Sequence, residues 1–338
     1  MTSFASGPSM GRTSETSMSN QSHESRQSHD RYLTRMSAYL RVMFPVGIRA
    51  FTAVALYLGF AAYMKLIHGV RTPVLSWHTL LGVWSIFAIL LILRLMDELK
   101  DLDIDRELFP HRPVPSGLVR LSDIRVTLVG TIVLYVLANA GSGTTLWPAL
   151  VTVTYALLMF RYFFMPGILR EHLPLNLATH NPIIAFVFLH ASAVFAAEQD
   201  LGLRQLEWPA SALLILMFWG PLFSWEIARK IRAPEEETAY VTYSQLWGRT
   251  GSVAVVLAAQ AGALALGLIL SVQFSFPRAW LALGTVGFAS AAWAALRYLR
   301  RPSGRTSQLA PFAEGYAMAL CVAGLVAYGL AGLSLGAP

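Results

Sequence analysis

The sequence is short of charged residues and of cysteine. Of its 338 residues only 13% are Asp, Glu, Lys or Arg, whereas 55% are hydrophobic, and the mean hydropathy is +0.52. Soluble globular domains carry about 25% charged residues, so this composition excludes that class and indicates a chain that lies mostly in lipid. The single cysteine, Cys321, excludes a disulfide framework and a cluster of thiolate metal ligands.

Long apolar stretches also lack the period-two alternation that is typical of the strands of an outer-membrane barrel. Each stretch is close to the ~20 residues that a helix needs to cross a bilayer, and helices satisfy their backbone polar groups internally. We therefore predict an all-α, polytopic membrane bundle of about nine transmembrane helices. The expected spans cover residues 47–67, 76–96, 122–140, 145–165, 181–198, 208–226, 252–272, 278–297 and 312–334.

The distribution of Lys and Arg predicts how the chain is oriented. If the N-terminus is cytoplasmic, the outer loops hold only Lys65, Arg71, Arg204 and Arg278, and the other basic residues lie at the inner side. Cytoplasmic loops carry such an excess of basic residues. The excess positive charge, +7 in total, then faces the cytoplasmic leaflet and a bound anion. No nucleic-acid partner is needed to explain it.

The N-terminal segment lacks any long apolar run. The missing apolar run excludes a signal peptide with a hydrophobic centre. Residues 1–30 also contain nine Ser, a composition that favours a disordered segment. We predict a disordered cytoplasmic tail over residues 1–38 and a transmembrane domain over residues 39–338.

The few acidic residues gather in two places. Six of the nineteen lie between residues 97 and 107, and four lie between residues 226 and 237. These clusters follow the second and the sixth predicted span, which suggests two four-helix pseudo-repeats with a ninth helix added. We expect the two helix ends to form one site at the cytoplasmic side.

In the first cluster, helical spacing sorts the carboxylates. Glu98, Asp101 and Asp105 stand at i, i+3 and i+7, within an arc of about 60° on a continuing helix. Asp97 lies beside them, and Asp103 falls nearly opposite, as a solvated charge would. Hard oxygen ligands at this density suit Mg²⁺, which also bridges to substrate phosphates. The alternative is a solvated acidic helix end.

The segment PHRPVPSG follows directly. Pro110, Pro113 and Pro115 cannot continue a helix, so the chain should turn and hold Arg112 near the carboxylates. The planar guanidinium of Arg suits a phosphate group. The alternative is a basic residue that meets lipid headgroups.

The second cluster combines acidic and basic residues. Glu226, Arg229 and Lys230 share one helical face, and Pro234 should end that helix before three consecutive Glu. One interpretation assigns Glu226 to a metal site and Arg229, Lys230 and Arg232 to phosphate oxygens. The other is a surface ion pair, worth a few tenths of a kcal/mol, with a solvated run of Glu behind it.

The first cluster resembles the UbiA superfamily of intramembrane enzymes that use isoprenyl diphosphates. Its first motif has the form Asn-Asp-x-x-Asp-x-x-x-Asp, followed by Pro-x-Arg-Pro-x-Pro-Ser-Gly. Here the carboxylates of that motif stand at Asp97, Glu98, Asp101 and Asp105, and the second element stands at residues 110–117. The resemblance covers about residues 40–335.

The second cluster departs from the family's Asp-x-x-x-Asp, because Glu226 stands at the first of these positions and Lys230 at the second. Lys cannot bind Mg²⁺ but can bind diphosphate. Positive charge from Arg229, Lys230 and Arg232 would then replace one metal ion.

The resemblance implies that Mg²⁺ held by Asp97, Glu98, Asp101, Asp105 and Glu226, together with Arg112, neutralises a diphosphate leaving group. The prenyl group then passes to an aromatic or lipid acceptor. The alternative is a terpene cyclase, in which double bonds of the same chain capture the allylic cation. Aromatic residues on the inner halves of the spans could line its path: Tyr155, Phe160, Tyr162, Phe218, Trp219, Phe223 and Trp225.

Two further interpretations remain. Asn176, His180 and Asn181, at the inner start of the fifth span, either bind an acceptor or cap a helix. A cation transporter would place ionisable groups near the membrane midplane, where the predicted spans hold essentially none, so an enzyme is favoured.

Overall fold

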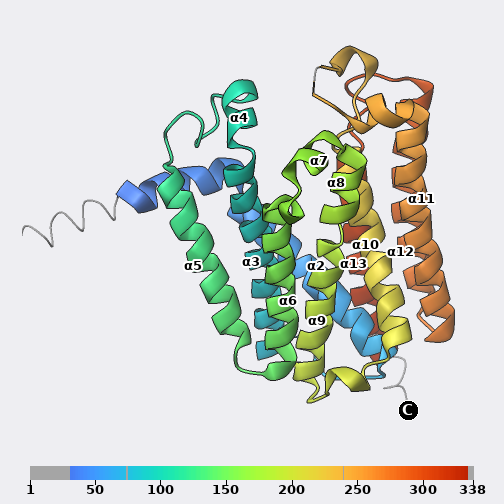
Figure 1. The fold of residues 1–338 in the computed structure, drawn as a ribbon. Coiled ribbons are helices and arrows are strands. Elements are labelled where there is room, and N and C mark those ends of the chain that lie inside the picture. The colour runs from blue at the N-terminus through green and yellow to red at the C-terminus, as the bar shows by residue number, and fades with distance from the viewer. Residues whose placement is uncertain (1–30, 74, 239, 334–338) are drawn as a thin grey trace, which may run out of the picture. The chain divides into compact units, whose positions relative to one another are not determined.

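The structure is a computed structural model that describes residues 31–73, 75–238 and 240–333 (Figure 1). These residues form helices and connecting loops, with no strand among them. Nine helical segments of the described chain are long and apolar enough to cross a membrane, which confirms the prediction. They are α2 (Val46–Ile67), α3 (Trp77–Lys100), α5 (Leu121–Asn139), α6 (Gly143–Phe160), α8 with α9 (Leu173–His180 and Ile183–Glu198), α10 (Trp208–Ala228), α11 (Tyr243–Gln273), α12 (Arg278–Arg300) and α13 (Ala310–Leu333).

Shorter helices connect these spans. They are α4 (Leu102–Leu108), α7 (Pro166–Glu171) and the single turns η1 (Tyr162–Phe164), η2 (Leu203–Gln205) and η3 (Pro234–Glu236). Residues 31–43 are helical as well, so the described part of the predicted tail, residues 31–38, is a helix. The rest of that predicted tail, residues 1–30, lies outside the described residues.

The chain divides into two compact units, which are described separately. The first lies within Met1–Val46 and Arg94–Val129, and the second within Gly47–Leu93 and Gly130–Pro338. Their boundaries cut through α3 and α5 and do not follow the predicted four-helix repeats, which stay a prediction.

In the second unit, helices α10 to α13 pack side by side through small residues (Figure 1). A Cβ atom added to Gly220 would lie 2.6 Å from the backbone oxygen of Ala259, and one added to Gly267 would lie 2.4 Å from the ring of Trp280. Membrane helices associate mainly through such close contacts, because lipid supplies no hydrophobic force between them. These glycines therefore set the spacing of the helices.

A buried polar contact lies within this apolar packing. The indole nitrogen of Trp280 donates to the hydroxyl of Tyr63 at 2.5 Å, and that hydroxyl donates to the backbone oxygen of Leu320 at 2.9 Å. Cys321 is buried where α13 approaches Gly59, as expected for a small core residue. The contacts tie α2, α12 and α13 together without leaving these donors unpaired.

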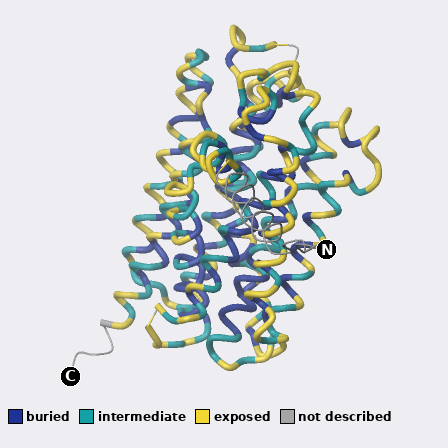
Figure 2. Tube along the Cα trace, turned by 90° about the vertical axis from the view of Figure 1, so that its left-hand side faces the viewer, coloured by how far each residue is buried: buried dark blue, intermediate teal, exposed yellow. Residues whose placement is uncertain are grey.

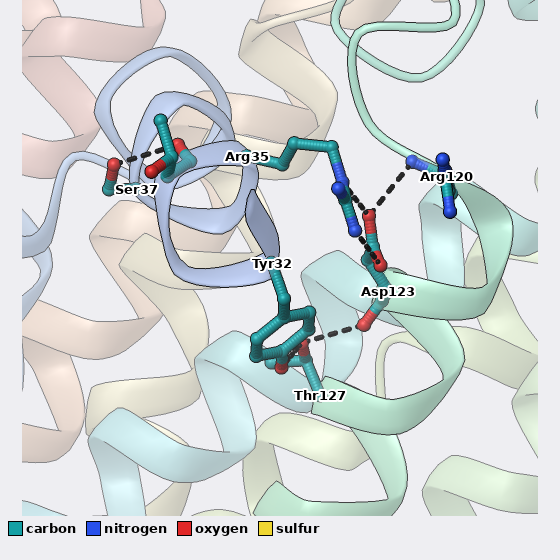
Figure 3. A network of polar contacts seen from close by, with 7 residues as sticks. Tyr32, Arg35, Ser37, Arg120, Asp123 and Thr127 are labelled. Atoms are coloured by element: carbon teal, nitrogen blue, oxygen red, sulfur yellow. Dashed lines mark hydrogen bonds and ion pairs between the residues drawn. The ribbon is translucent and has the colours of Figure 1, made fainter. Parts of the chain in front are cut away.

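In the first unit, polar contacts fasten the helix over residues 31–43 to α5 (Figure 3). The guanidinium of Arg35 donates to both carboxylate oxygens of Asp123, at 2.6 and 2.8 Å. The hydroxyls of Tyr32 and Thr127 lie 2.8 Å apart. A two-pronged contact between Arg and a carboxylate fixes orientation as well as distance, so this helix has a defined place on the unit.

Several spans expose large apolar side chains, and exposed residues alternate with buried ones along single helices (Figure 2). Val126, Leu137, Val272 and Val286 are examples. In water such surfaces would favour association. On helices of this length they face lipid, and the chain is an integral, multi-pass membrane protein.

One ion pair in the second unit is fully enclosed. The ammonium of Lys65 lies 3.1 Å from Glu198 Oε1 and donates to the hydroxyl of Thr72 at 2.7 Å, and the two charged side chains are 0% and 6% exposed. Removing one partner of a buried pair leaves an uncompensated charge, which costs more than the pair itself contributes.

We therefore expect Lys65→Met to destabilise the protein by about 3–5 kcal/mol, the usual cost of breaking a buried ion pair. The double variant Lys65→Met/Glu198→Leu should recover most of that loss. Thermal unfolding in detergent measures both, with the exposed Arg204→Gln as the control. A single variant as stable as the control would contradict this account.

Candidate functional site

The first acidic cluster lies at the junction of α3 and α4. The sequence predicts one continuing helix, but the structure corrects this, because α3 ends at Lys100 and the backbone bends at Asp101 (φ −102°, ψ 11°). Hydrogen bonds still run from the Asp101 N–H to the Asp97 oxygen at 2.9 Å, and from the Asp105 N–H to the Asp101 oxygen at 2.8 Å. The helical spacing of these carboxylates therefore survives the bend.

The carboxylates differ in exposure. Asp97 is exposed, Asp101 is half-buried, and Glu98 and Asp105 are buried. The side chain of Asp103 is 97% exposed, as expected for a solvated charge. A carboxylate that is removed from water requires a positive partner or several hydrogen-bond donors. Glu98 and Asp105 are thus the two positions where such a partner is needed.

Arg112 is the partner of Asp105. Its Nη1 lies 2.7 Å from Asp105 Oδ1, and its guanidinium stacks over the ring of Phe109 at 3.9 Å. The loop that carries it is tightly folded, with the Arg112 N–H donating to the Phe109 oxygen and the Ser116 N–H donating to the Arg112 oxygen, both at 3.0 Å. The predicted turn that brings Arg112 to the carboxylate row is confirmed.

Arg94 is the partner of Glu98, and sequence analysis missed it. Its Nη2 donates to Glu98 Oε1 across one helical turn, and the Glu98 side chain is only 1% exposed. The signal was present in the sequence: an Arg inside an otherwise apolar helix, four residues before an acid, is the spacing of an intrahelical ion pair. Two arginines thus lie on the first cluster.

The donor set suits magnesium in its chemistry. The cluster offers four carboxylates on one helical row, and hard oxygen ligands are those that Mg²⁺ prefers. In the described residues, however, no three acidic, His or Cys side chains gather closely enough to hold a metal ion. Arg94 and Arg112 hold Glu98 and Asp105, and the predicted Mg²⁺ ligands stay a prediction.

The second cluster lies at the end of α10. The guanidinium of Arg229 contacts both carboxylate oxygens of Glu226 at 2.6 Å, and the Lys230 ammonium lies 4.0 Å from the same carboxylate. Arg232 donates from Nη1 to the backbone oxygens of Arg229 and Ile231, at 3.0 and 3.1 Å. The predicted shared face of Glu226, Arg229 and Lys230 is confirmed.

Glu235 and Glu236 are exposed, as in the alternative of a solvated run, but all three consecutive Glu also accept hydrogen bonds. Glu235 accepts from the Gly304 N–H at 2.9 Å. Glu236 accepts from the Ala233 N–H at 3.1 Å and from the Ser307 hydroxyl at 2.8 Å. These contacts lower the pKa of Glu236, the Ala233 N–H most of all. They tie the loop after α10 to the loop after α12.

Glu237 and the start of α11 complete this loop. The carboxylate of Glu237 accepts from the Thr242 hydroxyl at 2.8 Å and from the Ser244 hydroxyl at 2.5 Å. Helix α10 ends at Ala228, before Pro234, so the proline is not its stop signal, contrary to the prediction. At Gly248 the backbone of α11 takes a positive φ of 68°, which glycine adopts without strain.

The residues at the start of the fifth span bind one another. The Nδ1 of His180 lies 2.9 Å from the backbone oxygen of Asn176, and the Asn176 amide donates to the Leu169 oxygen at 3.1 Å. The oxygen of the buried Asn181 side chain has no hydrogen-bond partner. Asn176 therefore lies inside α8 and contacts α7, whereas Asn181 is the C-cap residue of α8; acceptor binding stays a prediction.

The predicted aromatic residues fall into three groups. Phe218 lies in the core of the second unit, and Trp219 stacks on Phe223 at 4.5 Å. Tyr155 donates to the Thr179 oxygen at 2.7 Å. Tyr162 and Phe164 flank Phe163 in a turn where all three have positive φ, and Phe164 is 76% exposed. Left-handed backbone at three consecutive non-glycine residues is strained.

The fold of the chain is similar to that of two solved membrane proteins, although its sequence matches no known family. No protein-family model matches the chain, and no curated protein matches its sequence. A solved structure from work on digeranylgeranylglyceryl phosphate synthase in membranes superposes with a TM-score of 0.59 at 16% identity, covering 87% of this chain and 99% of that one. The chain has a UbiA-type fold. The apo structure of a UbiA homologue from Aeropyrum pernix K1 agrees, with a TM-score of 0.57 at 18% identity, covering 81% and 96%.

The resemblance that the first motif predicts is thus confirmed at the level of the fold. Both matches cover nearly the whole of the solved chains, so the likeness is not confined to one helical hairpin. Identity below one fifth does not carry an activity across. The two solved structures therefore show the fold of this chain and not its activity.

The pH dependence of the second loop tests its structure. Because the pKa of Glu236 is lowered from 4.5 on folding, its contribution to stability is present above pH 4.5 and is lost as the pH falls through its folded value. We expect the protection of amides at residues 233–237 and 303–307, relative to their intrinsic exchange rates at each pH, to fall between pH 5 and pH 3. Glu236→Gln should show fast exchange at every pH, and the exposed Glu171→Gln should not. An unchanged exchange rate in Glu236→Gln would contradict the tie between the loops.

Proposed function

We propose that this protein is an integral membrane enzyme that ionises an isoprenyl diphosphate and transfers the prenyl group to an aromatic or lipid acceptor. One observation carries the proposal: a UbiA-type fold bears the Asp97 to Asp105 motif with Arg112 already paired to Asp105 at 2.7 Å. A carboxylate row for a divalent metal and a fixed guanidinium for phosphate are the two parts that such a reaction needs.

A leaving diphosphate carries negative charge, and residues of the first unit would place positive charge against it. Asp101 and Asp97, with Asp105, would hold Mg²⁺, which when bound supplies positive charge to the diphosphate oxygens. Arg112 would donate to those oxygens from a guanidinium whose place is set by Phe109 and by its folded loop. Charge that develops on the leaving group is then met by donors that need no rearrangement.

In the second unit, Arg229, Lys230 and Arg232 would add positive charge at the end of α10. Arg229 contacts Glu226 and the face of Trp225, at 5.4 Å from the ring centroid. Lys230 stands where an acid would bind metal in the family's motif, and a cation at that position can bind phosphate directly. We assign Glu226 to holding these cations in place as well as to metal binding.

A second candidate function is a terpene cyclase. The observation that favours it is the altered second cluster, since Lys230 in place of an acid sets this chain apart from the usual pattern of prenyltransferases. In a cyclase the allylic cation is captured by a double bond of its own chain, and no acceptor is required. Aromatic side chains would stabilise that cation.

Product analysis separates the two. Detergent-purified protein is incubated with Mg²⁺ and ten-, fifteen- or twenty-carbon isoprenyl diphosphate, without an acceptor. We expect the diphosphate to remain largely intact until a phenolic or glycerol-based lipid acceptor is added. Formation of a cyclic hydrocarbon or alcohol without acceptor would replace transfer by cyclisation. Consumption of no substrate under any condition would overturn both.

Single variants test the roles of the carboxylates. Asp101→Ala and Asp105→Ala should each lower diphosphate release by at least about 100-fold, since each removes a group that stabilises the developing charge. Asp103→Ala should keep most of the activity, because this side chain is solvated and opposite to the row. Equal losses in all three would refute the assignment by helical face.

The proposal also predicts how the chain is oriented in the membrane. We infer that the N-terminus and the two charged loops face the cytoplasm, where isoprenyl diphosphates are available and where basic loops are retained. The partners are then the isoprenyl diphosphate, the acceptor and the bilayer itself.

A further inference from the structure

One exposed face of α12 changes from apolar to basic along its length. At 100° per residue, its members fall within an arc of about 60° on the helix. They are Ala282, Val286, Trp293, Arg297 and Arg300, and all five are exposed. The buried residues of α12 lie on the opposite side of the helix. The exposed face thus runs from small and apolar residues through an aromatic ring to two arginines.

The order of these residues matches the layers of a membrane surface. Apolar side chains face the hydrocarbon, Trp is enriched at the interface, and the long side chain of Arg extends to the headgroups. At 1.5 Å per residue, Arg297 and Arg300 follow Trp293 by about 6 and 10.5 Å along the helix axis. The two guanidinium groups are therefore expected at the depth of the lipid phosphates.

The helices around this face carry little negative charge. Helix α12 packs against α11 and α13. The sequences of α11 and α12 contain no acid, and that of α13 contains one, Glu314. The ring of Trp293 lies 6.2 Å from that of Phe312 on α13, and Glu314 stands about 200° further around that helix. The positive charge of Arg297 and Arg300 therefore calls for an anionic partner from outside these helices.

Other acids meet the loop that follows α12. Glu235 accepts from the Gly304 N–H at 2.9 Å, and Glu236 accepts from the Ser307 hydroxyl at 2.8 Å. Arg301 and Arg305 belong to this loop or border it. We therefore restrict the site to the two arginines on the helix itself.

Contacts on two faces of α12 fix the place of this site. The guanidinium of Arg297 lies over the ring of Trp293, 5.4 Å from its centroid. On the buried face, the hydroxyl of Tyr298 donates to the backbone oxygen of Arg232 at 2.7 Å, which fastens this end of the helix. A planar guanidinium in a set position suits the oxygens of a phosphate group.

We propose that the end of α12 binds an anionic phospholipid, with its phosphate on Arg297 and Arg300 and its acyl chains along Trp293 and Val286. A lipid fits better than a free phosphate ion, because the arginines continue an apolar face along which acyl chains gain contact. An anionic lipid fits better than a zwitterionic one, whose own cationic group already balances its phosphate. Neither arginine belongs to the two charged clusters, so this inference does not depend on the proposed reaction.

Quenching of Trp293 by brominated lipids tests the site in the full chain. The protein is reconstituted into phosphatidylcholine vesicles that contain a minor fraction of brominated phosphatidylglycerol or, in a parallel sample, brominated phosphatidylcholine. The signal of Trp293 is the difference between a protein and its Trp293→Phe counterpart. We expect phosphatidylglycerol to quench this signal about threefold or more above phosphatidylcholine, because each arginine near the surface attracts anionic lipid.

Matched variants assign that preference to the two arginines. Arg297→Gln/Arg300→Gln should abolish it, whereas Arg297→Lys/Arg300→Lys, which keeps both charges, should retain most of it. The control Arg204→Gln/Arg278→Gln removes two exposed arginines at the other end of the spans and should leave it unchanged. Thermal unfolding checks each variant. If the first double variant does not fold, Arg297→Gln alone replaces it and should lower the preference about twofold or more.

Three results would overturn the inference. They are a wild type that both lipids quench equally, a preference that survives in Arg297→Gln/Arg300→Gln, and an equal loss in the control. Inorganic phosphate, compared with chloride at the same ionic strength, separates the two sources of the anion. We expect it to leave the preference unchanged, and a preference that phosphate alone removes would make the free ion the occupant and refute the lipid site.

Discussion

The cost of removing a charge from water determines where the acids and bases of this protein lie. A carboxylate at the end of a membrane helix loses its hydration and must gain a cation or several donors in exchange. The structure meets this requirement repeatedly: Arg94 holds Glu98, Arg112 holds Asp105, Arg35 holds Asp123, and Lys65 holds Glu198. Each of these pairs also joins or orders a segment, so charge compensation and folding cannot be separated here.

The same requirement explains why the first cluster could serve a reaction. Two of its four carboxylates, Glu98 and Asp105, are held by arginines, and Asp97 and Asp101 are more exposed than these two. In the proposed reaction, a diphosphate would bring negative charge to a place where Mg²⁺ and Arg112 would bring positive charge. In the proposed reaction, the acids that would bind the metal and the arginine that would bind the leaving group lie in one short segment of the chain.

The sequence predicted the nine spans well because each is set by one physical quantity, the length of an apolar run. It also predicted that Arg112 lies near the carboxylates, since prolines limit how far that loop can reach, but not that Asp105 is its partner. Arg94 was missed because it lies in an apolar run that predicts a membrane-spanning helix, and residues in such a run were not considered as site residues. The contacts of Glu235 with Gly304 and of Glu236 with Ser307 were not predicted, because these partners lie about 70 residues further along the chain and leave no local signal.

The central claim is that the carboxylate row holds the metal on which cleavage of an isoprenyl diphosphate depends. The most direct test is to measure diphosphate release by purified protein after treatment with a chelator, while Mg²⁺ is titrated back. The account predicts that release is lost with the chelator, returns as Mg²⁺ is added, and does not return in Asp101→Ala. Release that persists in the chelator, or that Mg²⁺ restores equally in Asp101→Ala, would contradict it.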